Sequence, residues 1–277
     1  MSIALIDGDI FTRRFTSAAE HEMFQLSNGE EVRTRTKANK ACEEDPTVSI
    51  LDSYRVTSPI HFVQHSIRLA ISDIMETTGA ADFAIYLGER GGKNFRHELY
   101  PEYKAHRKQK KKPEHYEAIY NWLIEEYQAT ICYNVEADDM LGILTSVYSD
   151  WFICSNDKDM LQIPGKHYNF IKKEKIAVSQ INGDKMLFTQ VLMGDPTDNI
   201  PGLQGVGEVT AKKMMRPTED VKEMYEVAAS AYKEQHGDDW FNQLMLNGSL
   251  VYLLRKHGDS FAQYLARNGA IPESHVA

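Results

Sequence analysis

Three short apolar runs, each followed by a carboxylate, constrain the fold of this chain more than any other feature of the sequence. The runs cover residues 3–6, 83–87 and 151–154, and the acids that follow them are Asp7, Glu89, Asp157 and Asp159. Runs without polar alternation are typical of strands buried on both faces of a parallel sheet. Because open α/β sheets place their sites at the carboxyl ends of the strands, we expect these acids to share one edge. Asp and Asn also favour turns after strands, so each single acid has a structural explanation as well.

Helical patterns separate the apolar runs. Ser58-Pro59 has the composition of a helix cap followed by a first-turn proline, and apolar residues then recur at helical spacing from residue 60 to 74. A second amphipathic pattern follows Pro113, and a third extends from about Glu136 to Tyr148. Alternating β and α elements predict an α/β domain with a parallel sheet. Residues 17–57 are polar and irregular, and no element is predicted for them.

Two further acidic clusters lie later in the chain. Glu136, Asp138 and Asp139 fall in the first turn of a predicted helix, where the helix dipole alone favours acids. Asp195 and Asp198 fall in a segment with the composition of a turn. Three acids within four residues nevertheless exceed what a cap requires, and a bound divalent cation would remove their repulsion.

Together the clusters indicate a metal site. If the nine acids converge, their charge needs cations, and oxygen ligands without His or Cys suit Mg²⁺ or Mn²⁺. Two such ions can bind the attacking and leaving oxygens of a phosphodiester displacement. The chain carries 40 acidic and 31 basic residues, a net charge of −9. Without the nine acids the two counts would be equal, so the net acidity does not argue against a nucleic-acid partner.

Basic residues are concentrated elsewhere. The segment from Lys104 to Lys112 holds six cations in nine residues. A solvated charged face is one interpretation, but the nearby Tyr100 and Tyr103 favour a nucleic-acid strand with stacked bases. The segment 200–213 joins two helical patterns through glycines, and such a hairpin brings backbone amides close to phosphates without reading bases.

Other features of the 277-residue chain predict a protein of the cytoplasm. No apolar stretch approaches the roughly 18 residues of a membrane span, and the first residues do not resemble a signal peptide. Three cysteines, without a CxxC or Cys/His pair, argue against both a disulfide framework and a zinc site.

Four ordered blocks of the sequence resemble the 5′ nuclease (flap endonuclease) superfamily. They read LGERGGKNFRHELYPEYKAHR, VEADDMLG, ICSNDKDMLQI and MGDPTDNIPGLQGVGEVTAKK. They look like the blocks of the 5′→3′ exonucleases of T-odd bacteriophages and of the 5′-nuclease domain of bacterial DNA polymerase I. The resemblance extends, with a gap at 17–57, from Asp7 to about Met215.

The resemblance implies a role for each matching residue. The first metal ion would be held by Asp7, Glu89, Glu136 and Asp138, and the second by Asp157, Asp159, Asp195 and Asp198. The catalytic residues would be Lys104, Arg107 and Asp139. Contacts with DNA would come from Arg96, Tyr103, Lys108, Lys110, Lys111, Gly202, Gly205, Gly207 and Lys212. Family members usually have Asp at the position of Glu89, which makes this ligand the exception in the set.

The resemblance also implies a parallel-sheet, PIN-like α/β nuclease domain at residues 1–180 and a smaller helical domain with a helix-hairpin-helix at 181–277. The expected activity is structure-specific 5′→3′ exonuclease and flap endonuclease cleavage of DNA with two Mg²⁺ or Mn²⁺ ions, with K⁺ at the hairpin. The expected substrates are DNA with 5′ ends or single-strand/duplex junctions, and RNA–DNA hybrids. The protein is expected to be a monomer without membrane contact, in the host cytoplasm if a phage encodes it. The alternatives are a PIN-type ribonuclease and a non-catalytic DNA junction-binding protein.

Overall fold

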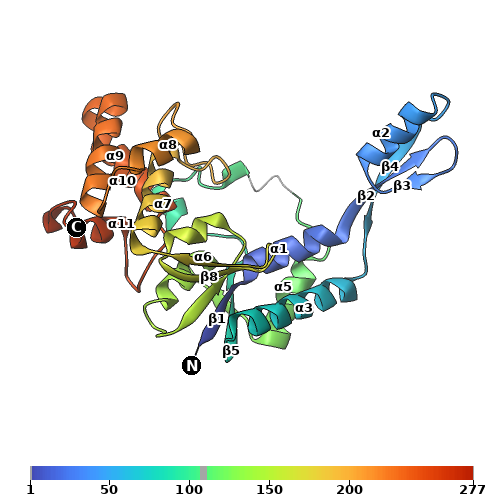
Figure 1. The fold of residues 1–277 in the computed structure, drawn as a ribbon, viewed down its shortest axis with the longest axis horizontal. Coiled ribbons are helices and arrows are strands. Elements are labelled where there is room, and N and C mark those ends of the chain that lie inside the picture. The colour runs from blue at the N-terminus through green and yellow to red at the C-terminus, as the bar shows by residue number, and fades with distance from the viewer. Residues whose placement is uncertain (1, 107–110, 277) are drawn as a thin grey trace. The chain divides into compact units, whose positions relative to one another are not determined.

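The structure, a computed structural model, describes residues 2–106 and 111–276, and its centre is a six-stranded sheet (Figure 1). The strand order is β6-β5-β1-β7-β8-β9, with β9 antiparallel to β8 and the other neighbours parallel. The strands are β1 Ile3–Asp7, β5 Asp82–Gly88, β6 Thr130–Cys132, β7 Trp151–Cys154, β8 Gly165–Asn169 and β9 Glu174–Val178. The three apolar runs form β1, β5 and β7, which confirms the predicted α/β fold with a mostly parallel sheet.

Burial on both faces explains why these strands lack polar alternation. Leu5 and Ile6 in β1 are completely buried, as are Ile153 and Cys154 in β7. Full burial of one such Leu or Ile side chain stabilises the fold by roughly 1.5–3 kcal/mol. Ile6 pairs with Ile85 of β5 on one side and with Cys154 on the other. The carboxyl ends of β1, β5 and β7 therefore reach the same edge of the sheet.

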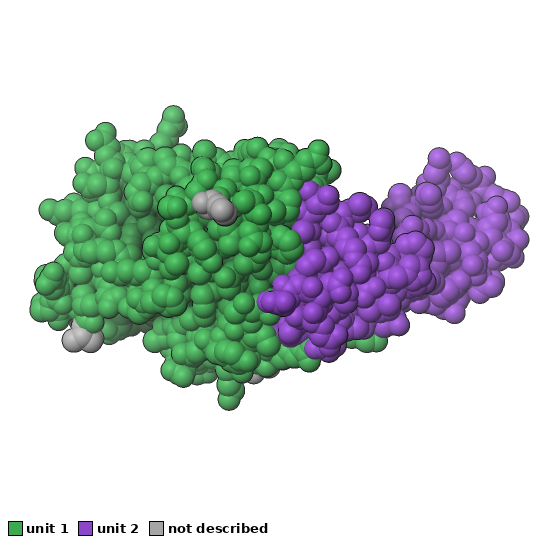
Figure 2. Space-filling model, turned by 90° about the horizontal axis from the view of Figure 1, so that it is seen from below, with its two compact units in different colours: residues 1–9, 73–111, 129–277 green, residues 10–72, 112–128 purple. Residues whose placement is uncertain are grey.

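The chain divides into two compact units, coloured separately in Figure 2. Unit 1 contains residues 1–9, 73–111 and 129–277, and unit 2 contains residues 10–72 and 112–128. This division does not coincide with the boundary expected near residue 180. The reason is that one buried apolar cluster in unit 1 combines Tyr103 and Ile143 with residues of the C-terminal helices, such as Leu187 and Leu250.

The C-terminal helices of unit 1 pack together around one buried apolar cluster (Figure 1). They are α7 Gln180–Met193, α8 Glu208–Met215, α9 Val221–His236, α10 Trp240–Val251 and α11 Phe261–Arg267, with the short η3 Gly237–Asp239 and η4 Glu273–His275. Three further helical segments, α4 Phe95–Leu99, α6 Ala137–Leu144 and η2 Lys158–Gln162, lie between strands of the sheet along the chain. The predicted helix near Glu136 is α6, but it ends at Leu144 and not at Tyr148. Tyr148 lies beyond the end of α6 and is 36% exposed, so it does not belong to the apolar face of the helix.

Unit 2 contains the segment that the sequence left unassigned. Its elements are α1 Gly8–Ala19, β2 Glu20–Leu26, β3 Glu31–Val32, α2 Arg35–Glu44, β4 Ile50–Thr57, α3 Ile60–Thr78 and α5 Tyr116–Tyr127, and the division between the units falls inside α1 and α3. The predicted helices after Ser58-Pro59 and Pro113 are α3 and α5. In α3 the apolar stripe is buried, with Ile67 and Ile74 completely inaccessible.

Residues 20–57, which we name the β2–β4 module, form a small antiparallel sheet of order β3-β2-β4 with α2. Phe24, Leu26, Ala38 and Val48 make its own buried core. Most side chains of β4 are exposed, so the strand has no buried face to impose an alternating pattern. This explains why the sequence predicted no element here.

Candidate active site

Hydrogen bonds tie the ends of three strands together at the acidic edge of the sheet. Asp7, the last residue of β1, is 3% exposed. The Ser155 hydroxyl donates to Asp7 Oδ2 at 3.0 Å and accepts the backbone N–H of Asp157 at 3.0 Å. Both carboxylate oxygens of Asp9 accept the backbone N–H of Gly88 at 3.1 Å. The acids after β1 and β7 are thus brought together as the sequence predicts.

Asp9 and Ser155 lie at this edge without having been predicted. Burial and the charges of Asp9, Asp138, Asp139 and Asp7 raise the pKa of Cys132, at the end of β6, to about 12. Asp9 therefore belongs to the acidic edge. The sequence carried a signal for it, since Asp9 follows Asp7 by two residues at the end of a buried strand.

Glu136 begins α6 and is held by two side chains from the segment before residue 107. Lys104 Nζ lies 2.6 Å from Glu136 Oε1, and the Tyr103 hydroxyl donates to Oε2 at 3.0 Å. Although burial alone would raise the pKa of Glu136, the charges of Lys104 and Arg96 lower it to about 2. Glu136 is therefore ionised and fixed in position.

Asp138 has the opposite electrostatic environment. Burial and the negative charges of Glu136 and Asp139 raise its pKa well above the usual range. One of its oxygens, Oδ1, accepts the backbone N–H of Asp139 at 2.7 Å. Asp138 is thus the carboxylate of α6 whose charge the protein itself compensates least.

Asp139 and Arg96 form a buried pair. The guanidinium donates to Asp139 Oδ2 at 2.6 Å and to Oδ1 at 2.8 Å, and it also donates to the carbonyls of Leu250 and Tyr252 at 2.9 and 2.7 Å. Asp139 is completely buried, Arg96 is 1% exposed, and the backbone N–H of Leu254 donates to Asp139 Oδ1 at 3.2 Å.

These positions change the expected roles of three residues. The predicted contact of Arg96 with DNA does not fit, because its guanidinium is enclosed and already bonded within the protein. Tyr103 is 2% exposed with its hydroxyl on Glu136, so base stacking on its ring does not fit either. Asp139 has both oxygens occupied by Arg96. We therefore regard Arg96, Tyr103 and Asp139 as positioning residues for Glu136 and Asp138.

A second group of acids gathers around η2. Asp157 caps η2 by accepting the backbone N–H of Asp159 at 2.9 Å. Burial and the charges of Asp157, Asp195 and Asp198 raise the pKa of Asp159 to about 7. Asp159 Oδ1 is buried and has no hydrogen-bond partner among the described residues. Asp157, Asp159, Asp195 and Asp198 thus converge from two distant parts of the chain.

The turn at 195–200 connects this group to the first one. Asp195 and Ile200 exchange backbone hydrogen bonds of 2.9 and 2.8 Å, and the carbonyl of Asp198 accepts the backbone N–H of Lys104 at 2.9 Å. Asp198 Oδ2 lies 3.4 Å from Lys104 Nζ. Since the same ammonium contacts Glu136, Lys104 stands between the two groups of carboxylates.

Not every predicted residue joins this arrangement. Glu89 is exposed after β5, and within residues 2–106 and 111–276 no hydrogen bond or ion pair links its carboxylate to the other acids. Lys111 is also exposed. Arg107, Lys108 and Lys110 lie outside the described residues. In the described part of the chain, no three His, Cys, Asp or Glu side chains are already close enough together to hold a metal ion.

The donor set nevertheless fits divalent cations. The unpartnered oxygen of Asp159 and the raised pKa values of Asp138 and Asp159 mark negative charge that the nearby cations, Lys104 and Lys158 among them, compensate only in part. Burial of such a charge is costly unless a cation neutralises it. Carboxylates without His or Cys suit Mg²⁺ and Mn²⁺ better than zinc.

The glycine segment forms the predicted hairpin between α7 and α8. Gly202 has φ +59, and a Cβ there would lie 2.3 Å from the backbone nitrogen of Gly194, so only glycine allows this close approach. Gly205 and Gly207 face open space: a Cβ at either would meet no atom within 4 Å. Their backbone is therefore accessible to a ligand.

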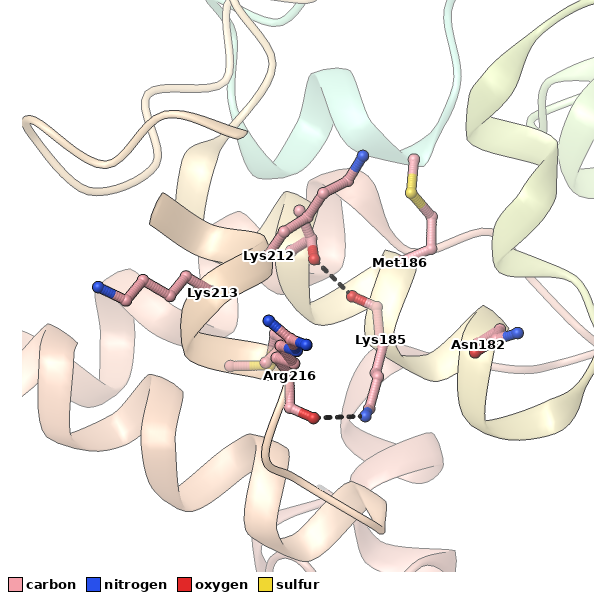
Figure 3. Close-up of a pocket in the computed structure, with 8 residues that line it drawn as sticks. Asn182, Lys185, Met186, Lys212, Lys213 and Arg216 are labelled. Atoms are coloured by element: carbon pink, nitrogen blue, oxygen red, sulfur yellow. Dashed lines mark hydrogen bonds between the residues drawn. The ribbon is translucent and has the colours of Figure 1, made fainter. Parts of the chain in front are cut away.

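A hollow of about 500 Å³ lies between α7 and α8, beside the hairpin (Figure 3). It is lined by Asn182, Lys185, Met186, Thr189, Lys212, Lys213, Met215 and Arg216. Lys185 Nζ donates to the carbonyl of Arg216 at 3.0 Å, and Lys212 pairs with Glu208 at 2.6 Å. Four cationic side chains thus surround this hollow, and Lys212 is one of the residues predicted to contact DNA.

Of the helices described, none is both long and apolar enough to cross a bilayer.

Comparison with known proteins finds similarity to the same family that the sequence blocks resemble. Residues 54–189 match the model of the 5′-3′ exonuclease, N-terminal resolvase-like domain. The chain is 31% identical over 185 residues to a DNA polymerase I of Synechocystis, covering 57% of this chain and 18% of the polymerase. It is 27% identical over 172 residues to a 5′-3′ exonuclease of Bacillus subtilis, covering 54% and 57% of the two chains. The match therefore spans less than two thirds of these relatives.

Solved structures agree on the fold. A bacteriophage T5 flap endonuclease in complex with DNA and metal ions has a TM-score of 0.59 and 16% identity, covering 100% of this chain and 95% of that chain. A zinc-bound T5 5′-exonuclease has a TM-score of 0.56, also at 16% identity, covering 100% and 96%. At this identity the likeness establishes the fold, which both halves of the chain share with these nucleases.

Proposed function

We propose that this chain, which belongs to the 5′-3′ exonuclease family over residues 54–189, hydrolyses DNA phosphodiester bonds near 5′ ends and at single-strand/duplex junctions. The observation that carries the proposal is the position of Lys104, whose ammonium lies 2.6 Å from Glu136 and 3.4 Å from Asp198. A preorganised cation between two groups of acids is suited to stabilise charge on a phosphate held there.

Two divalent ions complete the proposed site. We assign one to Asp7, Glu136 and Asp138, and the other to Asp157, Asp159, Asp195 and Asp198. When bound, Mg²⁺ or Mn²⁺ would supply activation of water and neutralisation of the phosphate and leaving-oxygen charges. Arg96 and Asp139 keep α6 in place, Ser155 orients Asp7, and Lys104 stabilises negative charge on the phosphate. No side chain needs to form a covalent bond to the substrate.

The hairpin and the hollow beside it are the proposed duplex-binding surface. The exposed backbone of Gly205 and Gly207 permits approach to phosphates, and the cations around the hollow add attraction that is independent of base sequence. The segment from Lys104 to Lys112, part of which lies outside the described residues, is proposed to contact the single strand at a junction.

A gel assay tests the proposal. A labelled 5′ flap, a blunt duplex, an RNA–DNA hybrid and a single-stranded RNA are incubated with the protein in Mg²⁺ or in EDTA. We expect Mg²⁺-dependent cleavage near 5′ ends of the DNA substrates, leaving 5′-phosphate and 3′-hydroxyl termini. Cleavage of the RNA alone would favour a PIN-type ribonuclease, and binding without cleavage would favour a junction-binding protein.

Two accessory properties are tested in the same preparation. Replacing K⁺ with Na⁺ in a duplex-binding titration tests the monovalent site proposed at the hairpin, where K⁺ is expected to give tighter binding. Analytical ultracentrifugation with and without DNA tests the proposed monomer, and a concentration-dependent dimer would contradict it.

A further inference from the structure

The β2–β4 module, residues 20–57, supplies no residue to either group of carboxylates. It is a folded piece with its own core, in which Phe24, Leu26 and Ala38 are at most 1% exposed. All but its last four residues precede the family match at 54–189. Neither the proposed catalytic residues nor the match to the family model therefore accounts for this part of the chain.

Charge is strongly segregated within the module. Arg33, Arg35, Lys37 and Lys40 are four exposed cations within eight residues, and no acid occurs between residues 32 and 42. Among the described residues, the first three form no ion pair. Lys40 lies 3.5 Å from Glu44 with both side chains mostly exposed, a contact that contributes little. The four charges are thus available to an anionic ligand.

The arrangement of charge on α2 does not serve the helix itself. Its first turn contains Arg35 and Lys37, whereas the end of the helix contains Glu43 and Glu44. A helix is stabilised by acids at its start and by cations at its end, so this order is the reverse of the favourable one. The cost in helix stability indicates that the cations serve a function outside the helix.

The helix that carries three of these cations, α2, is packed onto the small sheet of the module. Ala38 packs α2 onto the small sheet, the guanidinium of Arg35 lies 5.5 Å from the ring centre of Phe24, and Thr34 caps the helix by accepting the backbone N–H of Lys37. Lys37 and Lys40 are three residues apart and lie on one face of α2, about 4.5 Å apart along the helix axis, whereas Arg35 lies on another face. Long cationic side chains at this spacing reach neighbouring backbone phosphates.

We propose that Arg33, Arg35, Lys37 and Lys40 of the β2–β4 module form a second DNA-contacting surface that binds backbone phosphates without reading bases. The choice of DNA as the anionic ligand rests on the proposed function, because DNA is the polyanion that a chain with that function binds. Duplex and single-stranded DNA carry the same phosphodiester groups, so the surface can bind either. An acidic protein segment is the alternative ligand that the test must exclude.

The test compares two double variants that remove the same amount of charge. Arg33→Gln with Lys37→Gln removes two cations of the surface, and Lys222→Gln with Lys256→Gln removes two exposed cations of unit 1. Affinity for a duplex and for a single strand is measured by fluorescence anisotropy without divalent ions at several salt concentrations. Circular dichroism melting verifies that both variants are folded.

We expect the module variant to bind several-fold more weakly and to lower the slope of log affinity against log salt by about two units, while the control pair changes neither by a comparable amount. A reduction with only one of the two nucleic acids identifies which is bound. An unchanged slope, or equal reductions from both variants, overturns the proposal, and the first result would favour an acidic protein partner. Failure of the proposed function is seen separately, as absence of cleavage by the unaltered protein.

Discussion

The two groups of carboxylates differ in how their negative charge is balanced. Glu136 is held by Lys104 and Tyr103, and Asp139 by Arg96, so most charge in the first group has a partner inside the protein. In the second group Asp159 has a buried oxygen without a partner and neighbours of like charge. The difference teaches that the first group is largely organised by contacts within the fold, whereas the second has one contact with Lys104, through Asp198, and keeps buried charge that these contacts do not balance.

The largest effect is expected in the second group. Asp157→Asn should lower single-turnover cleavage by on the order of 10³-fold or more, because a proposed metal ligand is lost from the group of acids with the least internal compensation. DNA affinity should be retained or become tighter, since a charge that repels phosphate has been removed. Quench-flow kinetics and anisotropy measure the two quantities, with Asp238→Asn as an exposed control. Loss of the folded state would instead make Asp157 a structural acid.

In the first group the largest effect should be on stability. Arg96→Met leaves Asp139 buried without its partner, which should cost about 3–5 kcal/mol in the free energy of unfolding. Replacing both residues, as in Arg96→Met with Asp139→Leu, should cost less than the single change. Urea unfolding measures each value, and Arg14→Met on an exposed side chain is the control. Equal stability of Arg96→Met and the unaltered protein would refute the comparison drawn above.

Lys104 connects the groups, so its removal should affect the reaction more than binding. We expect Lys104→Ala to lower the saturating single-turnover rate by at least about tenfold, with little change in duplex affinity. Lys111→Ala should show the opposite pattern, a salt slope lower by about one unit and an unchanged rate. If both substitutions have small and equal effects, Lys104 is one of several surface cations and has no specific role in the reaction.

Substitutions of Glu89 test whether this residue belongs to the first group of carboxylates. Because Glu89 is exposed and unlinked to the other acids, Glu89→Gln should lower the cleavage rate by less than about tenfold, the range of a contact made through water. Glu89→Asp should retain activity. The cleavage rate of each variant is measured at increasing Mg²⁺ concentrations. A loss of rate as large as that of Asp157→Asn would make Glu89 a direct metal ligand.

The smallest effect is expected outside both groups, at the hairpin. Gly207 has φ −91 and ψ 178, and a Cβ there meets nothing within 4 Å, so Gly207→Val should leave the fold intact and weaken duplex binding several-fold. Every duplex sequence should be affected alike. Gly202→Ala is the contrasting variant, since its Cβ would overlap backbone and should prevent the hairpin from folding. Weakening limited to particular sequences would contradict the proposed backbone contact.

Local patterns predicted the sheet, the principal helices and most of the acidic edge. Buried parallel strands leave a continuous apolar run, and their carboxyl ends must meet, which is why Asp7 and Asp157 could be placed together from the sequence. The helix start at Glu136 was recognisable for the same reason, because capping is a property of a few adjacent residues.

The features that the sequence did not predict depend on distant partners or on exposed surfaces. Nothing local shows that Arg96 pairs with Asp139, 43 residues away, and not with a phosphate. The β2–β4 module escaped prediction because β4 is exposed on most positions, so hydrophobic periodicity carries no information there. Its structure is specified by only four well-buried side chains.

The contacts of Arg96 and Asp139 with the segment after α10 have a consequence for biosynthesis. The carbonyls of Leu250 and Tyr252 and the backbone N–H of Leu254 complete the bonding of this pair, which lies beside Glu136 and Asp138. On the ribosome, residues 96 and 139 emerge long before residue 254, and a domain cannot form contacts with residues not yet made. The nascent chain can therefore form its sheet before it can complete the bonding of Arg96 and Asp139, which requires that residue 254 has been synthesised.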